Sequence, residues 1–297
     1  MIDKELYKRD IQVSSDGLAK AINRALCGAE LATYYADELA RTLVYSCQSE
    51  EEFIFEYNRV SFDDIFKGVS DNAQRATLLA YFCRSVYEYA AKKGSPIEPE
   101  SFFETEAVEG NMVTYVKNAV SDEAYRVFER VLGEATVFYS ESFASACEEV
   151  YYGRLPFCIL PYENSTEGTL SGFGALMRKY ELYKQCVYSC KSENGITKLA
   201  LMSRAPCVLK SYEGKRMFLR VTFYTSEQKH ALLEISAAAA ALSLTLIKTE
   251  SVPLSFDSER YSEEITFSGE KSQIVPFLIY LALEQTDCSD KEVFFEV

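Results

Sequence analysis

A short polar run that follows an apolar segment offers the clearest set of groups that could do chemistry. Residues 156–161 are uncharged and mostly apolar, residues 163–168 read Glu-Asn-Ser-Thr-Glu-Gly, and a helical apolar pattern begins near residue 169. A buried strand that ends in a loop at a helix N-terminus presents unpaired backbone N–H groups there. Asn164, Ser165 and Thr166 add side-chain donors. The pattern predicts a carboxylate or phosphate site. The alternative is a plain helix cap formed by Ser165 or Thr166.

The six residues from Glu163 to Gly168 resemble the signature of prephenate dehydratases, which convert prephenate to phenylpyruvate with loss of water and carbon dioxide. Upstream, Ser142-Phe143 is similar to the Ser-Phe segment of the family. Downstream, Thr197-Lys198-Leu199 stands where the family has Thr-Arg-Phe on its last strand. Residues 113–124 are similar to its first strand and helix, and the resemblance extends over residues 112–297.

This resemblance implies a role for each matching residue. Thr197 would be the catalytic hydroxyl that helps the leaving hydroxyl of the substrate to depart, although Thr197-Lys198 also fits an ordinary strand edge. The residues implied in substrate binding are Ser142, Phe143, Glu163, Asn164, Ser165, Thr166 and Lys198. Such chemistry needs a proton donor and a carboxylate clamp, and placement and electrostatics supply most of the acceleration. We therefore expect the Asn164 loop and Thr197 to share one hollow.

Three departures from the family pattern bear on activity. Residues 117–120 contain no glycine where the family has a glycine-rich loop. Lys198 replaces the arginine of the family, and an ammonium group cannot form the bidentate fork that matches a carboxylate. Only thirty-two residues separate Asn164 from Thr197, where the family carries a whole second lobe. We therefore expect one wall of the active cleft to be missing.

Three functions remain open from the sequence. The first is a reduced homologue that binds an aromatic-pathway carboxylate with weak or no turnover. The second is an active prephenate dehydratase, in which the N-terminal helices or a partner replace the lost lobe. The third is a non-catalytic scaffold or interaction protein. The missing lobe disfavours the second, since excluding water around a dianion needs walls on both sides, and the intact hexapeptide disfavours the third.

Composition and charge exclude several classes of protein. The chain has 297 residues and a net charge of −14, from 31 basic and 45 acidic residues. Nucleic-acid binders and proteins of anionic membranes need clustered cations, so we expect neither partner. No apolar stretch reaches membrane-spanning length, and the first residues lack an apolar signal region. With nine cysteines in no framework spacing, these features predict a cytoplasmic protein.

The scarcity of histidine limits the possible metal sites. His230 is the only histidine, which excludes histidine-rich metal sites. Cys186 and Cys190 lie in an alternating, strand-like run without a second pair nearby, so we interpret them as structural. We expect no metal and no cofactor.

Periodicity divides the chain into four parts. Residues 1–95 read as a helical domain, in which the segment from Asp71 to Lys93 carries one apolar face and ends at Gly94, and residues 96–111 read as a linker. Strands and helices alternate over residues 112–207, which predicts a single reduced α/β lobe. Residues 213–297 follow the strand-helix-strand-strand-helix-strand order of a ferredoxin-like domain. The fold class is therefore α/β, or α+β overall.

The last part resembles the regulatory ACT domain that is fused to prephenate dehydratases. Ala231-Leu232 and Glu250-Ser251 are similar to its two effector motifs, which bind phenylalanine between paired ACT domains. His230 replaces a glycine of the first motif and Val252 an arginine of the second. Because a side chain tends to block close approach of a ligand to backbone, we expect amino-acid binding there to be weakened. A homodimer through the ACT-like domains is the expected assembly.

Overall fold

The computed structural model describes residues 28–47, 71–103, 110–192, 195–224, 229–253, 261–284 and 288–297. The chain divides into two compact units, which are considered separately. One comprises residues 1–99 and 221–290, and the other residues 100–220 and 291–297. The division falls inside two strands, β7 (Met217–Tyr224) and β10 (Cys288–Glu296). Residues 1–27 and 48–70 of the predicted helical domain lie outside the described residues.

The second unit, residues 100–220 and 291–297, alternates strands and helices as the sequence predicts, which confirms the α/β class. Its elements after the short 3-10 helix η1 (Pro99–Phe102) are β1 (Met112–Tyr115), α6 (Ala119–Leu132), β2 (Thr136–Tyr139), α7 (Phe143–Tyr151), β3 (Phe157–Asn164), β4 (Gly168–Thr169), α8 (Ser171–Lys179), β5 (Tyr183–Ser192) and β6 (Gly195–Ser203). The strand order is β2-β1-β3-β6-β5, with the end of β10 parallel to β5. β1 is parallel to both β2 and β3, whereas β3, β6 and β5 run antiparallel.

Side-chain caps begin α6 and α7 of this unit. The Asn118 side chain accepts the Ser121 amide at 2.9 Å and starts α6. Ser142 accepts the Ser145 amide at 3.1 Å and starts α7. Each side chain satisfies one backbone donor that the first helical turn leaves without a helical partner.

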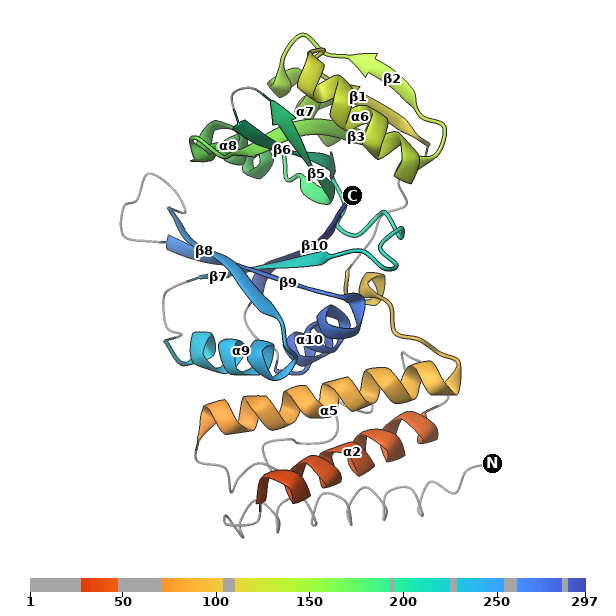
Figure 1. Ribbon diagram of the computed structural model, residues 1–297, viewed down its shortest axis with the longest axis vertical. Helices are drawn as coiled ribbons and strands as arrows, with labels where there is room; N and C mark the ends of the chain where they lie inside the picture. The colour runs from red at the N-terminus through yellow and green to blue at the C-terminus, as the bar shows by residue number, and fades with distance from the viewer. Residues whose placement is uncertain are drawn as a thin grey trace. The chain divides into compact units, whose positions relative to one another are not determined.

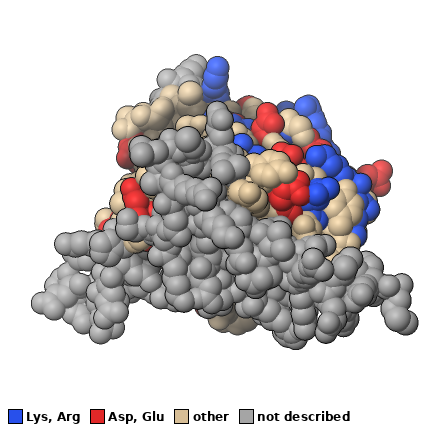
Figure 2. All heavy atoms as spheres, turned by 90° about the horizontal axis from the view of Figure 1, so that it is seen from below, with Lys and Arg blue, Asp and Glu red and all other residues tan. Residues whose placement is uncertain are grey.

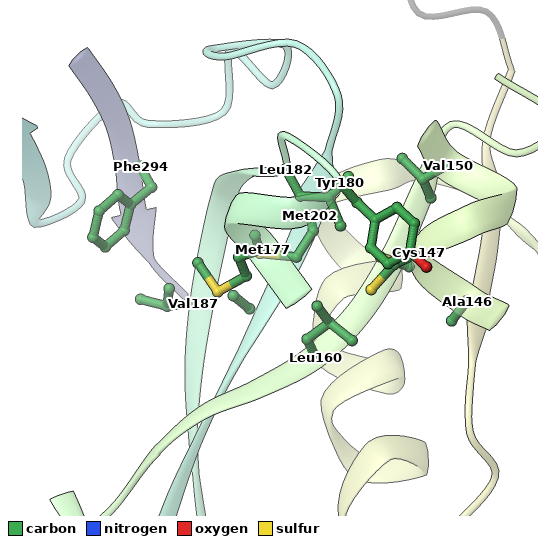
Figure 3. Close-up of a cluster of buried hydrophobic side chains, with 12 residues drawn as sticks. Ala146, Cys147, Val150, Leu160, Met177, Tyr180, Leu182, Val187, Met202 and Phe294 are labelled. Atoms are coloured by element: carbon green, nitrogen blue, oxygen red, sulfur yellow. The ribbon is translucent and has the colours of Figure 1, made fainter. Parts of the chain in front are cut away.

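One apolar cluster of the unit lies on the face of this sheet that we call the α7 face. Side chains of α7 and α8 pack there against alternate residues of β3, β5 and β6 (Figure 3). Its members include Ala146, Cys147, Val150, Cys158, Leu160, Met177, Val187, Ala200 and Met202. Because successive strand residues point to opposite faces, the residues between these strand positions point to the other face.

The first unit contains the ferredoxin-like elements. Around β7 and β10 these are α9 (Lys229–Ala241), β8 (Thr245–Pro253), β9 (Tyr261–Gly269) and α10 (Lys271–Leu283). The strand order is β10-β7-β9-β8, with β8 antiparallel to β9. The order of strands and helices along the chain is the one that the sequence predicts for residues 213–297.

Two N-terminal helices pack onto this ferredoxin-like part. α5 (Asn72–Lys93) lies against α9 and α10, and α2 (Gly28–Ser46) lies against α5 (Figure 1). Arg84 on α5 donates to the carbonyl of Ala241 at the end of α9, at 2.6 Å. α5 starts at the Asp71 cap and ends at Gly94, whose φ of 88° is left-handed, as the sequence predicts. The same unit therefore holds the described helices of residues 28–93 together with α9 and α10.

None of the described helices is both long and apolar enough to cross a bilayer. On the described surface at the right of Figure 2, basic and acidic side chains lie among one another rather than in separate fields.

Candidate functional site

The motif from Glu163 to Gly168 forms a β-hairpin turn, which differs from the expected loop at a helix N-terminus. β3 continues to Asn164, and β4 turns back to pair Glu163 with Thr169 and Asn164 with Gly168. α8 begins only at Ser171, with no side-chain cap. The strand runs past its predicted end at residue 161 because it keeps pairing with β6, down to Asn164 opposite Thr197.

Backbone and side-chain donors in this turn bond within the hairpin and to β6. The Ser165 amide donates to the Ile196 carbonyl at 2.8 Å, and the Ile196 amide donates back to Ser165 Oγ at 2.9 Å. Gly195 has a φ of +113°, and a Cβ built on it would collide with Ser165 Oγ. Glycine is therefore required where Ser165 closes against the start of β6.

Asn164 and Thr197 meet directly, as expected from the sequence. Asn164 Nδ2 donates to Thr197 Oγ1 at 3.2 Å, and both side chains are partly buried. The Thr166 amide donates to Asn164 Oδ1 at 2.8 Å. Because Oδ1 accepts from a backbone N–H, the amide orientation is fixed and Nδ2 must face Thr197. A hydroxyl that accepts in this way still has its own proton to donate.

Glu163 and Lys198 form an ion pair that belongs to the other side of the sheet. Lys198 Nζ lies 2.6 Å from Glu163 Oε1, with both side chains partly exposed. Lys198 has the same strand parity as Ala200, which lies in the apolar cluster of the α7 face, whereas Thr197 has the opposite parity. The structure therefore does not place Lys198 beside Thr197 on one ligand surface, and it pairs the ammonium group with a carboxylate.

The face that carries Thr197 is the one on which α6 packs, and we call it the α6 face. Cross-strand pairing sets Asn164, Thr197 and Cys190 in one row over β3, β6 and β5. Glu123, in the second turn of α6, accepts the hydroxyl of Tyr188 at 2.8 Å. It also accepts the thiol of Cys190. The family resemblance covers Glu123 within residues 113–124 but implies no role for it.

Electrostatics on the α6 face follow from these contacts. Hydrogen bonds from Tyr188 and Cys190 lower the pKa of Glu123, so the carboxylate is ionised at neutral pH. Burial, together with the hydrogen bond to Glu123 and its charge, raises the pKa of Cys190 to about 11. Cys190 is therefore a neutral thiol donor beside Thr197. The alternation of Tyr188 and Cys190 along β5 was the sequence signal that could have placed both on one face.

Ser142 and Phe143 lie away from the hairpin. Strand register puts Tyr115 and Tyr139, the ends of β1 and β2, level with Ile159. Asn164 lies five residues further along β3, about 16 Å at the usual rise per residue. Ser142 caps α7, and Phe143 packs edge-on against Phe173 at 4.9 Å beside the apolar cluster. The structure therefore does not bring these two residues to the row of Asn164 and Thr197.

The candidate effector residues lie on α9 and β8. Ala231 belongs to α9 and Leu232 follows it, about one third exposed. Glu250 lies 2.8 Å from Lys248 Nζ, and Ser251 Oγ donates to Glu263 at 2.7 Å. Both polar members are thus bonded to neighbours on β8 and β9.

Across the described residues, no three or more His, Cys, Asp or Glu side chains are grouped so that they could hold a metal ion. Cys186 and Cys190 are both buried, free cysteines.

Comparison with known proteins found solved structures of similar fold. No protein-family model matches the chain, and no curated protein matches it. A prephenate dehydratase from Streptococcus mutans is 19% identical, with a TM-score of 0.45, and the match covers 63% of this chain and 98% of that one. A prephenate dehydratase from Arthrobacter aurescens, solved in complex with L-Phe, is 14% identical, with a TM-score of 0.45 and coverage of 62% and 89%. A structure described as GqqA, a novel type of quorum quenching acylase, is 19% identical, with a TM-score of 0.46 and coverage of 62% and 94%. At these identities the likeness concerns the fold alone and does not bear on activity.

Proposed function

We propose that this chain is a prephenate dehydratase-like protein that binds an aromatic-pathway carboxylate with weak or no turnover. The observation that carries the proposal is the hydrogen bond between Asn164 and Thr197. It joins the two segments that resemble the family motifs, although the lobe expected between them is missing from the sequence. Helix capping alone would not require this contact between β3 and β6.

The chemistry available at this row supports binding more than turnover. Thr197 accepts from Asn164 and can donate its own proton to a ligand oxygen. Efficient elimination also needs a cation that clamps the substrate carboxylates. Lys198 is bonded to Glu163 and has the strand parity of the α7 face, so it supplies no such clamp next to Thr197. We therefore expect affinity for a carboxylate without efficient release of carbon dioxide.

Calorimetric titration of prephenate, phenylpyruvate and phenylalanine tests the binding. We expect the wild-type chain to bind at least one of the carboxylates and Thr197→Ala to weaken that affinity about tenfold, since a hydrogen bond to a charged group is worth roughly 1.5–3 kcal/mol. Ser189→Ala is the matched control. Ser189 of β5 pairs with Lys198, so this substitution removes a hydroxyl from the face opposite to Thr197, and the variant should bind as the wild type does.

An active prephenate dehydratase is the alternative. A phenylpyruvate-forming assay decides it: a rate above background that disappears in Thr197→Ala would establish the enzyme. A rate that survives this substitution would come from a contaminant. We expect no rate above background.

A scaffold is the second alternative, and one observation favours it. The amides of Ser165 and Thr166 and both ends of the Asn164 side chain are bonded within the protein. A turn with its donors already satisfied can serve the fold alone. If none of the three compounds gives a binding signal in the titrations, a scaffold role replaces the binding proposal.

We further propose that the ferredoxin-like part is an ACT-like domain that pairs with a second copy through β8. β8 is the last strand of its order and carries the exposed side chains of Leu246 and Ile247. Open strand edges with apolar residues favour pairing. Sedimentation should give a dimer, and Leu246→Lys should shift it toward monomer. A wild-type monomer at micromolar concentration would exclude this assembly.

For the effector residues we propose weak or no phenylalanine binding. Glu250 and Ser251 are bonded to neighbouring side chains, and His230 stands at the glycine position of the first motif. We also propose a cytoplasmic location, which the cysteine content supports.

A further inference from the structure

The row that continues from Thr197 toward α6 ends at a carboxylate. Asn164, Thr197 and Cys190 are consecutive cross-strand neighbours on one face of the sheet. Side chains paired in this way have Cβ atoms roughly 4.5–5.5 Å apart. Glu123 of α6 touches the far end of the row, since it accepts both Cys190 and Tyr188.

Two ends of this row differ in charge. Asn164 and Thr197 present a neutral amide and a neutral hydroxyl, which suit a carboxylate oxygen. Glu123 is an ionised and exposed carboxylate at the other end. Arg126 lies three residues further along α6 and Arg130 seven, and they act on Glu123 and Tyr188 respectively, so they offset part of this charge. A second negative group of a ligand that reaches toward Cys190 would still meet Glu123 first.

We propose that Glu123 is a specificity-determining residue of the Thr197 site, which favours a ligand with one carboxylate over a ligand with two. The ligand carboxylate binds at Asn164 and Thr197, and its uncharged end points toward the exposed Glu123. This inference rests on the proposed function, because it concerns a ligand bound at Thr197. It adds the class of that ligand: an aromatic monocarboxylate.

The physical reason is repulsion between like charges at short range. Two carboxylates within a few ångströms of each other repel, even at an exposed surface, by an amount that changes affinity several-fold. Cys190 and Tyr188 hold Glu123 at this place, since each donates a hydrogen bond to it. Both donors also stabilise the charged form, so the repulsion persists at neutral pH.

The test compares a dianion with a monoanion on matched variants. Prephenate carries two carboxylates and phenylpyruvate one, and calorimetry gives the ratio of their affinities for the wild type, Glu123→Gln and Glu129→Gln. Glu129 is the control, because it lies on the same helix and accepts a tyrosine hydroxyl, that of Tyr125 at 3.0 Å. Each substitution removes one negative charge from the chain.

We expect the wild type to bind phenylpyruvate more tightly than prephenate. Glu123→Gln should narrow this ratio roughly fivefold or more, while Glu129→Gln leaves it unchanged. A loss of structure around α6 would weaken both ligands and could not improve prephenate relative to phenylpyruvate. An equal ratio in the two variants would overturn the proposal.

The two proposals can fail separately. If neither ligand binds the wild type, the proposed function fails, and the specificity role of Glu123 fails with it. Suppose that both ligands bind and that Thr197→Ala weakens the affinity for both, but that Glu123→Gln leaves the ratio of the two affinities unchanged. The proposed function then stands, and only this inference is overturned.

Discussion

In the unit of residues 100–220 and 291–297, a carboxylate on one face of the sheet differs from a carboxylate on the other face in its burial and in the charge of its partners. On the α6 face, Glu123 is exposed and is held by two neutral donors, Tyr188 and Cys190. Toward the α7 face, Glu292 of β10 is fully buried and lies between two cations, with Arg220 Nε at 3.0 Å and Lys184 Nζ at 3.2 Å. The carboxylate of Glu123 is therefore available to act on a ligand. The carboxylate of Glu292 instead forms ion pairs that join β10 to β5 and β7.

Neighbouring residues of one strand therefore serve different purposes. Thr197 has the strand parity of the α6 face, and Lys198 has the strand parity of the α7 face. A motif that is continuous in sequence is split by the pleat of the strand. We therefore expect substitutions in the apolar cluster of the α7 face to change stability, and substitutions of Thr197 and Glu123 on the α6 face to change ligand binding.

The largest effect is expected from Glu292→Gln. It leaves the buried Lys184 and Arg220 side chains without their shared carboxylate, and breaking a buried pair costs about 3–5 kcal/mol. Urea unfolding measures the loss, with exposed Glu134→Gln as control. A change below about 1 kcal/mol would show that the burial does not impose this cost.

The same residue gives a pH dependence. Burial alone would raise the pKa of Glu292, but the charges of Arg220 and Lys184 outweigh it and hold the pKa below its ordinary value of 4.5. A lowered pKa in the folded state means that the contribution is present above pH 4.5 and is lost as the pH falls through the folded pKa. Between pH 6 and about pH 2, the free energy of unfolding should fall more steeply for the wild type than for Glu292→Gln. Parallel curves would contradict this assignment.

Leu160→Ala probes the apolar cluster of the α7 face. Leu160 is fully buried in the cluster of the α7 face, and truncation should cost about 2–5 kcal/mol through lost burial and the cavity left behind. Ile196→Ala, at a partly exposed position in β6, should cost far less. Similar urea midpoints for the two variants would count against the assignment of the core.

Gly195→Ala tests the closure of the hairpin. The left-handed backbone and the collision with Ser165 Oγ should together cost about 1–3 kcal/mol. The double variant with Ser165→Ala removes the collision but keeps the backbone strain, so it should recover part of the loss. Full recovery would mean that the backbone strain contributes nothing.

Lys198→Ala is expected to have the smallest effect. Its ion pair with Glu163 is partly exposed, and such pairs contribute about 0–1 kcal/mol. Because Lys198 does not share a face with Thr197, affinity for phenylpyruvate should stay within about twofold of the wild type, unlike in Thr197→Ala. A tenfold loss of affinity would show that Lys198 reaches the ligand, as the family resemblance implies.

Most of the fold could be predicted from the sequence. Periodicity predicts the order of the elements from β1 to β10 apart from β4, and the start of α5 at Asp71 and its end at Gly94 are local signals that the structure confirms. The hairpin at Glu163 to Gly168 was misread as a loop before a helix. Its two-residue return strand, β4, is too short to show a period, and pairing with β6 is what extends β3.

The site was predictable only in part. The resemblance brought Asn164 and Thr197 together correctly, but it grouped them with Ser142, Phe143 and Lys198, which the structure places elsewhere. No local sequence pattern points to Glu123, because its partners, Tyr188 and Cys190, are more than sixty residues away in the chain. The domain limits stay predictions, and the division of the chain into units groups α2 and α5 with α9 and α10.

Apart from the hairpin at residues 163–169, the sequence by itself determined the order of the elements and the ends of α5, and it singled out Asn164 and Thr197 as candidates, because each depends on local propensity or on a short motif. Only the tertiary structure decided which side chains share a surface. A bulge between Pro161 and Glu163 shifts the pairing of β3 with β6 and thereby sets the faces of Glu163 and Asn164. A shift of one residue exchanges the two faces of a strand, and no local pattern fixes it.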